Sequence, residues 1–187
     1  MPAIKPVELA TAPEASAKLL KAVEERIRRP MNMLRTLAHS PAMLDAYVHF
    51  IGVLEQCQLS PRLRTLISGT VAQEMGGEYM LSGIFAFGPR EGVSPAEIED
   101  SRHARSDDHT TQQVLQFAAK AIQEHGHLPS SEVESLRQAG FSDQEIVEVI
   151  GMIALNVWRN LFNLIAQTPI DFPPVKLDQT LAAAGDA

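Results

Sequence analysis

The stretch SDQEIVEVIGMIALNVWRNLFNLI, residues 142–165, decides the fold class. Ser142, followed three residues later by Glu145, has the pattern of a capping box, which opens a helix by satisfying its first backbone N–H groups. Apolar residues then recur on almost every face of this helix rather than along one stripe. Such a helix must be buried on several sides, so we expect it to lie at the centre of the domain and to contact another subunit as well.

The rest of the chain has the pattern of further helices with clear start signals. Ser40-Pro41, Ser60-Pro61 and Ser94-Pro95 each place a capping serine before a proline, which suits the first position of a helix. More helices are expected over residues 13–29, 108–125 and 130–140. No long run alternates with period two, which argues against strands. The sequence predicts an all-α protein of about seven or eight helices, with a single domain over residues 1–175 and a frayed tail over 176–187.

Composition and charge narrow the function classes. The 187 residues are 45% hydrophobic and 21% charged, as in soluble globular domains. The net charge of −7, with acids and bases mixed, weighs against nucleic-acid binding. We also expect no membrane association, because there is no polybasic segment and because Arg159 and three asparagines interrupt the apolar tract 149–165. The N-terminus shows no apolar signal region and the chain has one cysteine, so a cytoplasmic location is expected.

A glycine pair, Gly76-Gly77, interrupts the helical pattern within VAQEMGGEYMLSGI, residues 71–84. Residues 74–84 of this junction, followed by GVSPAEIEDSR (92–102), and two flanking segments resemble the carboxymuconolactone decarboxylase / alkylhydroperoxidase D-like family, over roughly residues 30–173. The flanking segments are LAHSPAMLDAYVHFIGVLEQCQLSPRLRTLISGTVAQ (37–73) and AGFSDQEIVEVIGMIALNVWRNLFNLIAQTPIDFP (139–173). The resemblance implies an all-α, alkylhydroperoxidase D-like helical bundle that forms a homo-oligomer, whether dimer, trimer or hexamer. We expect neither a cofactor nor a metal.

Redox members of that family carry Cys-x-x-Cys at the junction, a His one turn further on and a Glu on the preceding helix. Aligned with them, this chain has Gly77 and Met80 for the cysteines, Ile84 for the His and Thr65 for the Glu. None of these side chains forms a thiolate or relays a proton near neutral pH. The remaining cysteine, Cys57, is expected near a helix C-terminus, where the macrodipole disfavours a thiolate. The resemblance therefore implies a member that has lost the peroxidase dithiol.

Polar residues near the junction are candidates for binding a small organic ligand: Tyr79, Glu74, Arg64, His103 and Asn160. Tyr79 can donate a hydrogen bond or act as a weak acid, and a desolvated Glu74 can act as a base. Arg64 can hold anionic oxygens, although a solvated helix face or an ion pair with Glu55 or Glu74 is the commoner explanation. His103 shares with His109 a polar loop that either folds over the junction or caps a helix. Asn160 either lines the pocket or ties its helix to neighbouring backbone.

Three functions stay open on the sequence alone. The leading hypothesis is a protein that binds or turns over a small organic molecule without thiol redox chemistry. Non-redox decarboxylation or lactone chemistry, as in the name-giving branch of the family, would be the corresponding reaction type. The alternatives are alkylhydroperoxidase-like antioxidant activity, which the family suggests, and a non-catalytic oligomeric scaffold.

The pocket separates these hypotheses. It is expected to be lined by Thr65, Gly77, Tyr79, Met80 and Ile84. An open cavity at Gly77 and Ile84 favours ligand binding, because small-molecule sites are concave and largely preformed. A cavity plugged by Met75, Met80 or Phe85 favours the scaffold.

Overall fold

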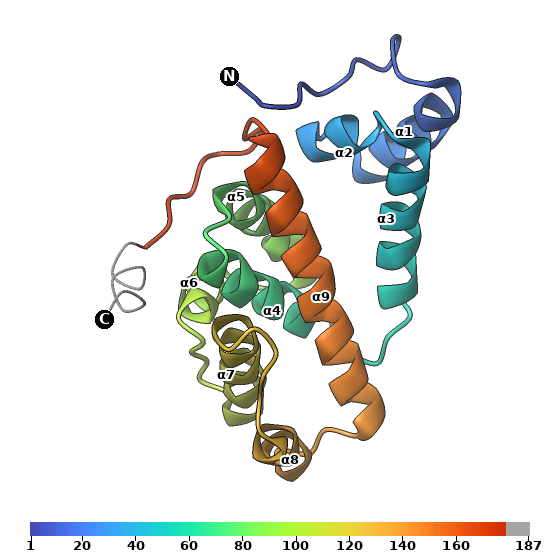
Figure 1. Cartoon of the computed structure of the whole chain (residues 1–187). Coiled ribbons are helices and arrows are strands. Elements are labelled where there is room, and N and C mark those ends of the chain that lie inside the picture. Colours follow the sequence, from blue (N-terminus) through green and yellow to red (C-terminus); the bar gives the residue numbers. More distant parts are fainter. Residues whose placement is uncertain (179–187) are drawn as a thin grey trace.

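The computed structural model describes residues 1–178, and within them it contains nine α-helices, one short 3₁₀ helix and no strand (Figure 1). The long helix α9, Asp143–Ala166, runs through the middle of the molecule, with α3, Pro41–Leu54, along one side. Helix α4, Pro61–Glu74, contacts α5, α6, α7 and α9 on the other side. The all-α prediction is confirmed. The remaining bounds are α1 Glu14–Ile27, α2 Asn32–Leu37, α5 Glu78–Phe87, η1 Gly88–Glu91, α6 Pro95–Arg102, α7 His109–Gln123 and α8 Ser130–Gln138.

Serine side chains open the helices at the predicted places. The Oγ atoms of Ser40, Ser60 and Ser94 each accept a backbone N–H from three residues on, at 3.4, 3.1 and 3.2 Å. Ser142 opens α9 with a complete capping box, because the Glu145 carboxylate accepts from the Ser142 N–H at 2.9 Å in return. These caps satisfy N–H groups that have no partner inside the helix. Local sequence therefore sets these helix starts.

The short helix α2 was not predicted. It spans six residues and follows Met31, which provides no side-chain cap, so no start signal marks it. Its Leu34 and Leu37 are nonetheless buried in the core. Helices this short are not stable by propensity alone, so packing against α3 holds α2 in place.

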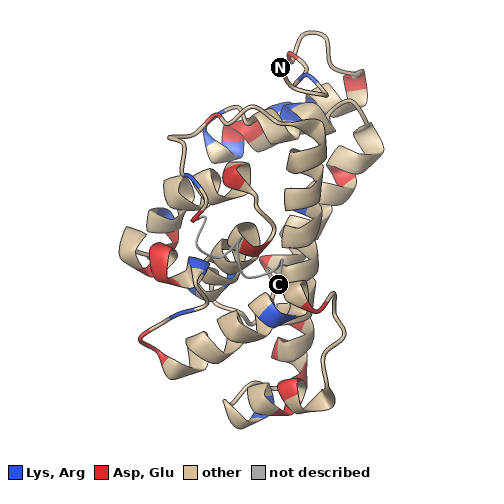
Figure 2. Ribbon diagram, turned by 60° about the vertical axis from the view of Figure 1, so that its left-hand side comes forward, with Lys and Arg blue, Asp and Glu red and all other residues tan. Residues whose placement is uncertain are grey.

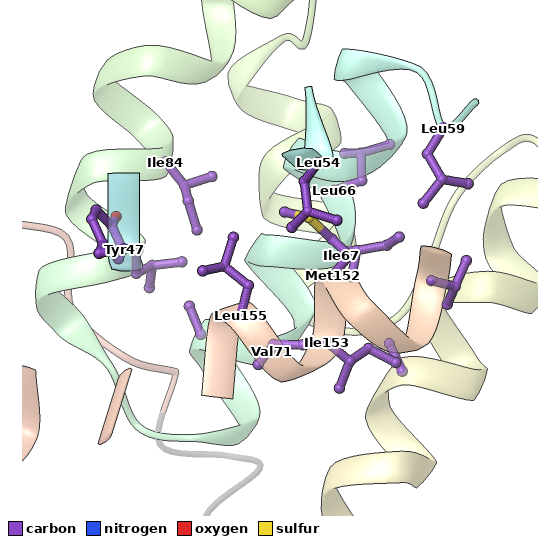
Figure 3. Close-up of a cluster of buried hydrophobic side chains, with 14 of the residues drawn as sticks. Tyr47, Leu54, Leu59, Leu66, Ile67, Val71, Ile84, Met152, Ile153 and Leu155 are labelled. Atoms are coloured by element: carbon purple, nitrogen blue, oxygen red, sulfur yellow. The ribbon is translucent and has the colours of Figure 1, made fainter. Parts of the chain in front are cut away.

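The core lies where α3, α4, α5 and α9 meet (Figure 3). Leu66 and Ile67 of α4 are fully buried and face Met152 and Leu155 of α9. Every residue of α4 from Leu66 to Gln73 is buried. Because α4 is enclosed on all sides, it provides a fixed frame for the neighbouring residues of α5.

One face of α9 is exposed in the single chain, although the sequence predicted burial on several sides. Val147 is 67% exposed, Ile150 50% and Ile165 69%. By length and composition α9 could also cross a membrane, but 44% of its most apolar window is buried inside the protein. Core helices of soluble proteins pass the same test. The expected contact of this face with another subunit stays a prediction.

The last described residues pack onto the bundle as a strap, which we define as residues 169–178. The buried Arg102 donates to the carbonyl oxygen of Lys176 at 2.8 Å, and Gln73 Nε2 donates to that of Asp178 at 3.0 Å. The prediction of a frayed tail is therefore wrong for residues 176–178, because these two buried side chains hold their backbone. The rest of that predicted tail, 179–187, lies outside the described residues.

Acidic and basic residues are interspersed along the helices (Figure 2). Many form ion pairs, such as Arg137 with Asp143 at 2.8 Å and Lys120 with Glu132 at 2.8 Å. The view in Figure 2 contains no continuous basic stripe of the kind that neutralises phosphates.

Candidate ligand cavity

A cavity of about 280 Å³, here called the main cavity, lies between α3, α4, α5, α9 and the strap. Its apolar wall includes Met80, Ile84 and Phe87 of α5 and Met152 and Leu155 of α9, and Figure 3 shows Ile84 and Leu155 extending into the same space. The other lining residues are Met31, Met33, Tyr47, Ile51, Leu54, Glu55, Pro61, Arg64, Thr65, Ser68, Tyr79, Gly83, Gly88, Glu91, Arg159 and Phe172.

A second hollow of about 560 Å³ adjoins the main cavity on the side of α1. The two share Tyr47, Ile51 and Arg159 among their lining residues. Val23 and Ile27 of α1 line the far side of the second hollow. The two hollows are therefore neighbours that share part of their wall.

Three of the four positions that the sequence resemblance aligns with the redox motif lie together in the main cavity. Thr65, Met80 and Ile84 all line it. Gly77 is not among the lining residues of this cavity; together with Tyr79 it lines a separate hollow of about 330 Å³. A Cβ atom built at Gly77 would lie 1.7 Å from Asn160 Oδ1, so the Asn160 side chain fills the space next to it.

Asn160 is a structural residue that does not line the main cavity, contrary to its assignment as a ligand-binding residue. It is fully buried, and its Nδ2 donates to the carbonyl oxygen of Asn156 at 2.8 Å. Asn156 and Asn163 make the same kind of bond to the backbone one turn earlier. Asn156 donates to the carbonyl oxygen of Met152 at 2.8 Å, and Asn163 donates to that of Arg159 at 2.9 Å. The three asparagines thus bind the backbone of their own helix.

Tyr79 lines the cavity with its ring but uses its hydroxyl elsewhere. The hydroxyl oxygen accepts the backbone N–H of Met33 at 3.1 Å. Burial, and then the nearby charge of Asp171, raises the pKa of Tyr79 well above its usual range. Its ring packs edge-on against Phe172, with centroids 5.5 Å apart. Tyr79 therefore forms part of the cavity wall. The predicted role of its hydroxyl as a weak acid does not suit it near neutral pH.

Arg64 lines the main cavity as the sequence suggested, and it forms neither of the expected ion pairs. Its Nη1 donates to the carbonyl oxygen of Leu54 at the end of α3. Arg62, two residues earlier in α4, pairs instead with Glu97. A role for Arg64 in ligand binding stays a prediction, now with the side chain in a suitable place.

Glu74 and His103 lie away from the main cavity, so their predicted ligand contacts do not form there. Glu74, at the end of α4, accepts from Gln123 Nε2 of α7 at 3.0 Å. His103 follows the last residue of α6, is not among the residues that line the main cavity, and lies 3.5 Å from Asp178 of the strap. Within residues 1–178, no three His, Cys, Asp or Glu side chains gather in a way that suits a metal ion.

Arg159 and Tyr47 are among the cavity residues that the sequence did not predict. Arg159 Nε donates to the Tyr47 hydroxyl oxygen at 3.1 Å, and both residues line the cavity. The sequence did contain a signal, because Arg159 is the one charged residue in the apolar stretch 149–166. A charge kept within a buried helix usually has a specific partner or function.

Cys57 is separate from this site. It is half-buried after the end of α3 and does not line the main cavity. Burial, and then the charge of Glu148, raises the pKa of the Cys57 thiol. A raised pKa leaves less of the reactive thiolate at neutral pH, and the absence of a redox role for Cys57 stays a prediction.

Comparison with known proteins identifies the fold. No protein-family profile matches the sequence, and no curated protein matches it. The debrominase Bmp8, in a crystal structure with 2,3,4-tribromopyrrole, superposes with a TM-score of 0.77 at 17% identity, over 90% of this chain and 91% of that one. A peroxidase-related protein from Ralstonia eutropha JMP134, described as an alkylhydroperoxidase AhpD core, gives 0.75 at 18% identity, over 90% and 93%.

A second peroxidase-related protein, from Silicibacter sp. TM1040, gives a TM-score of 0.75 at 20% identity, over 92% of each chain. The chain therefore has the alkylhydroperoxidase D-like helical fold. This finding confirms the fold that the sequence resemblance predicted. At such low identities the similarity extends to the fold and not to an activity.

Proposed function

We propose that this protein binds a small organic molecule in the main cavity, without thiol redox chemistry. The observation that carries the proposal is that Thr65, Met80 and Ile84, which stand where redox relatives carry proton-relay and thiol groups, line an open cavity. A chain with the single cysteine Cys57 has no dithiol to cycle. An apolar wall with a few polar groups is the usual composition of a small-molecule site.

The open state of the cavity supports ligand binding over the scaffold hypothesis. Met75 and Phe85, the side chains expected to plug a disused pocket, do not line it. Met80 does line it, yet about 280 Å³ stays open. The crystal structure of the similarly folded debrominase with 2,3,4-tribromopyrrole supports a compact organic molecule as the type of ligand.

Ligand binding can be followed through Trp158, the one tryptophan of the chain. Its ring packs edge-on against the cavity residue Tyr47, with centroids 5.4 Å apart. Small aromatic and aliphatic compounds that change Trp158 fluorescence should also raise the melting temperature, because ligands that bind only the folded state stabilise it.

The variant Ile84→Phe tests where the ligand binds. The larger ring fills the cavity, so the affinity should fall by at least about tenfold, as for other overpacked sites. Val53→Phe introduces the same ring at a position of α3 that is 57% exposed and outside the cavity. Equal affinities for the two variants would show that the ligand binds elsewhere.

Antioxidant activity of the alkylhydroperoxidase type is the second candidate, because the fold is shared with peroxidase-related proteins. In this chain it would have to depend on Cys57. Peroxide consumption with a dithiol reductant tests it directly. We expect no turnover above the uncatalysed rate, and robust turnover that disappears in Cys57→Ser would overturn the proposal.

We also propose that the chain forms a homo-oligomer through the exposed face of α9. Val147, Ile150 and Ile165 are each at least half exposed there, and contiguous apolar patches usually mark an interface. Ile150→Glu should reduce the mass measured by light scattering at micromolar concentration. A wild-type monomer under the same conditions would contradict the proposal. The single cysteine suits a cytoplasmic location, which cell fractionation tests.

A further inference from the structure

Two arginines line the main cavity without a carboxylate partner. Arg64 and Arg159 are both half-buried, and within residues 1–178 neither forms an ion pair. Other arginines of the same part of the chain do pair with carboxylates: Arg26, Arg35, Arg62, Arg102, Arg105 and Arg137. The cavity therefore keeps two positive charges that the protein itself does not neutralise by direct contact.

Neutral groups hold both guanidinium groups in position. Arg64 Nη1 donates to the carbonyl oxygen of Leu54, and Arg159 Nε donates to the Tyr47 hydroxyl oxygen at 3.1 Å. Arg159 Nη1 makes only a long contact of 3.5 Å with Asn156 Oδ1. A guanidinium group carries five N–H donors, so each arginine keeps donors for a ligand while one arm is fixed.

Two hydroxyl groups add to this donor set. The Tyr47 hydroxyl accepts from Arg159, and its own proton has no acceptor within residues 1–178. Thr65, also in the cavity lining, makes no side-chain hydrogen bond in the same part of the chain. Besides the two arginines, the cavity thus contains two hydroxyl groups that can donate to a ligand.

The acidic residues of the cavity do not cancel this charge. Glu55 and Glu91 both line it, but both are exposed. Glu55 is already paired with Arg26, at 3.4 Å. Both acids are therefore exposed to solvent, whereas both arginines are half-buried.

We infer that the ligand of the main cavity is an organic acid whose carboxylate is bound by Arg64 and Arg159. Its aromatic or short aliphatic body packs against the apolar wall at Met80 and Ile84. A carboxylate suits these donors because the planar guanidinium group binds it through two parallel hydrogen bonds. This inference rests on the proposed function, and it adds the charge class of the ligand and the residue Arg159.

Matched pairs of acids and amides test the inference: benzoate with benzamide, phenylacetate with phenylacetamide, and hexanoate with hexanamide. Each pair has nearly the same shape and differs in charge. Titration calorimetry and Trp158 fluorescence should show at least one acid binding about tenfold or more tightly than its amide, which is the effect of one charged hydrogen bond.

The variants Arg64→Gln and Arg159→Gln identify the responsible residues. Each should weaken binding of the acid by about tenfold and change binding of the amide by less than about twofold. Arg28→Gln removes the same charge at an exposed position that lines neither cavity, so it should leave both affinities unchanged. If either cavity variant fails to fold, Tyr47→Phe keeps the ring and should weaken only acid binding.

The outcomes separate this inference from the proposed function. If amides bind as tightly as acids and Ile84→Phe abolishes both, the charge class is wrong and the cavity is still the site. If the two glutamine variants weaken acids and amides equally, the arginines act on the shape of the cavity and the inference is overturned. If no acid and no amide binds at millimolar concentration, both proposals fail.

Discussion

The side-chain oxygen of Asn160 occupies the space into which any side chain at Gly77 would extend. A Cβ atom at Gly77 would lie 1.7 Å from Asn160 Oδ1 and 2.8 Å from its Cγ, well inside the contact distance of unbonded atoms. The backbone of Gly77, with φ −92°, is one that any residue adopts. Close approach alone therefore requires glycine here, and a cysteine at this position is incompatible with the Asn160 side chain in its present rotamer.

Gly77→Ala should destabilise the protein by about 1–3 kcal/mol, the usual cost of forcing an extra carbon into a packed site. Asn160→Ala removes the clashing oxygen and leaves only the Asn160 Cβ, 3.5 Å from the added carbon, which is an ordinary contact. The free energy of unfolding that the double variant loses should therefore be smaller, by about 1–3 kcal/mol, than the sum of the losses in the two single variants. Urea denaturation of all four proteins measures this coupling.

Gly76→Ala is the matched control for that cycle. Gly76 has φ +72°, so an alanine there is strained by its backbone conformation, and its added carbon would meet only Leu177, at 3.9 Å. Asn160→Ala should not relieve that strain. Strictly additive effects for Gly77 and Asn160 would contradict the contact described above.

Tyr79→Phe should cost stability and not ligand affinity. The change leaves the buried backbone N–H of Met33 without its acceptor, a loss of about 1–3 kcal/mol. Affinity for a cavity ligand should change by less than about twofold, because the ring that lines the cavity is kept. A large loss of affinity with unchanged stability would show instead that the hydroxyl contacts the ligand.

The raised pKa of Tyr79 also predicts a dependence on alkaline pH. The unfolded chain releases the phenol proton near pH 10, whereas the folded protein keeps it. Stability contributed by the neutral phenol is complete below that pH and falls as pH rises above it. Chemical denaturation at pH 9 to 11 should therefore show a steeper loss for the wild type than for Tyr79→Phe.

Glu97 should contribute stability that acid removes. Arg62, and then Ser94 at the start of α6, lower the pKa of Glu97 to about 2. The ionised carboxylate therefore stabilises the fold above its ordinary pKa of about 4.5, and this contribution is lost as pH falls through 2. Glu97→Gln should cost about 1 kcal/mol or less at pH 7, because the pair is partly exposed, and should flatten the pH profile between these limits.

Glu145→Gln is the matched control for Glu97→Gln. Glu145 has the same capping-box geometry at the start of α9, with Ser142 as the cause of its lowered pKa and with no arginine partner. Its variant reports the contribution of the capping box alone. If both variants show the same acid profile, the Arg62 contact adds nothing.

Arg102→Met should release the strap. Arg102 donates to Gln73 Oε1 at 3.0 and 2.9 Å as well as to Lys176, so its removal takes two donors from the Gln73 oxygen and one from the Lys176 carbonyl. We expect a loss of about 2–4 kcal/mol and faster hydrogen exchange at Val175, whose N–H is bonded to Ser82 Oγ at 2.9 Å. Arg105→Met removes a surface arginine of the same loop region and should change neither quantity.

Local signals in the sequence were sufficient for most of the fold. Ser40, Ser60, Ser94 and Ser142 cap the helices that they were predicted to cap, because capping depends on a few adjacent residues. Helix α2 has no such signal and is held by contacts with α3. An element that depends on tertiary packing cannot be found from its own residues.

Residues of the site could be predicted from the sequence only where they are close to one another along the aligned motif. Met80 and Ile84 share a face of α5, so both line the cavity once one of them does. The pairs that complete the site join distant segments: Asn160 with Gly77, and Arg159 with Tyr47. Which residues meet across such distances is set by the packing of α9 against α3 and α5.

Phe172 belongs to the strap and to the cavity at once. Its ring lines the main cavity and packs edge-on against Phe87, with centroids 5.7 Å apart. A ligand that packs on Phe172 therefore prefers the protein with the strap in place. By thermodynamic reciprocity, the same ligand must raise the fraction of molecules in which the strap is docked. Protection of the Val175 amide from hydrogen exchange is thus a measure of how much of the main cavity is occupied by ligand. This measurement requires no substitution of a cavity residue.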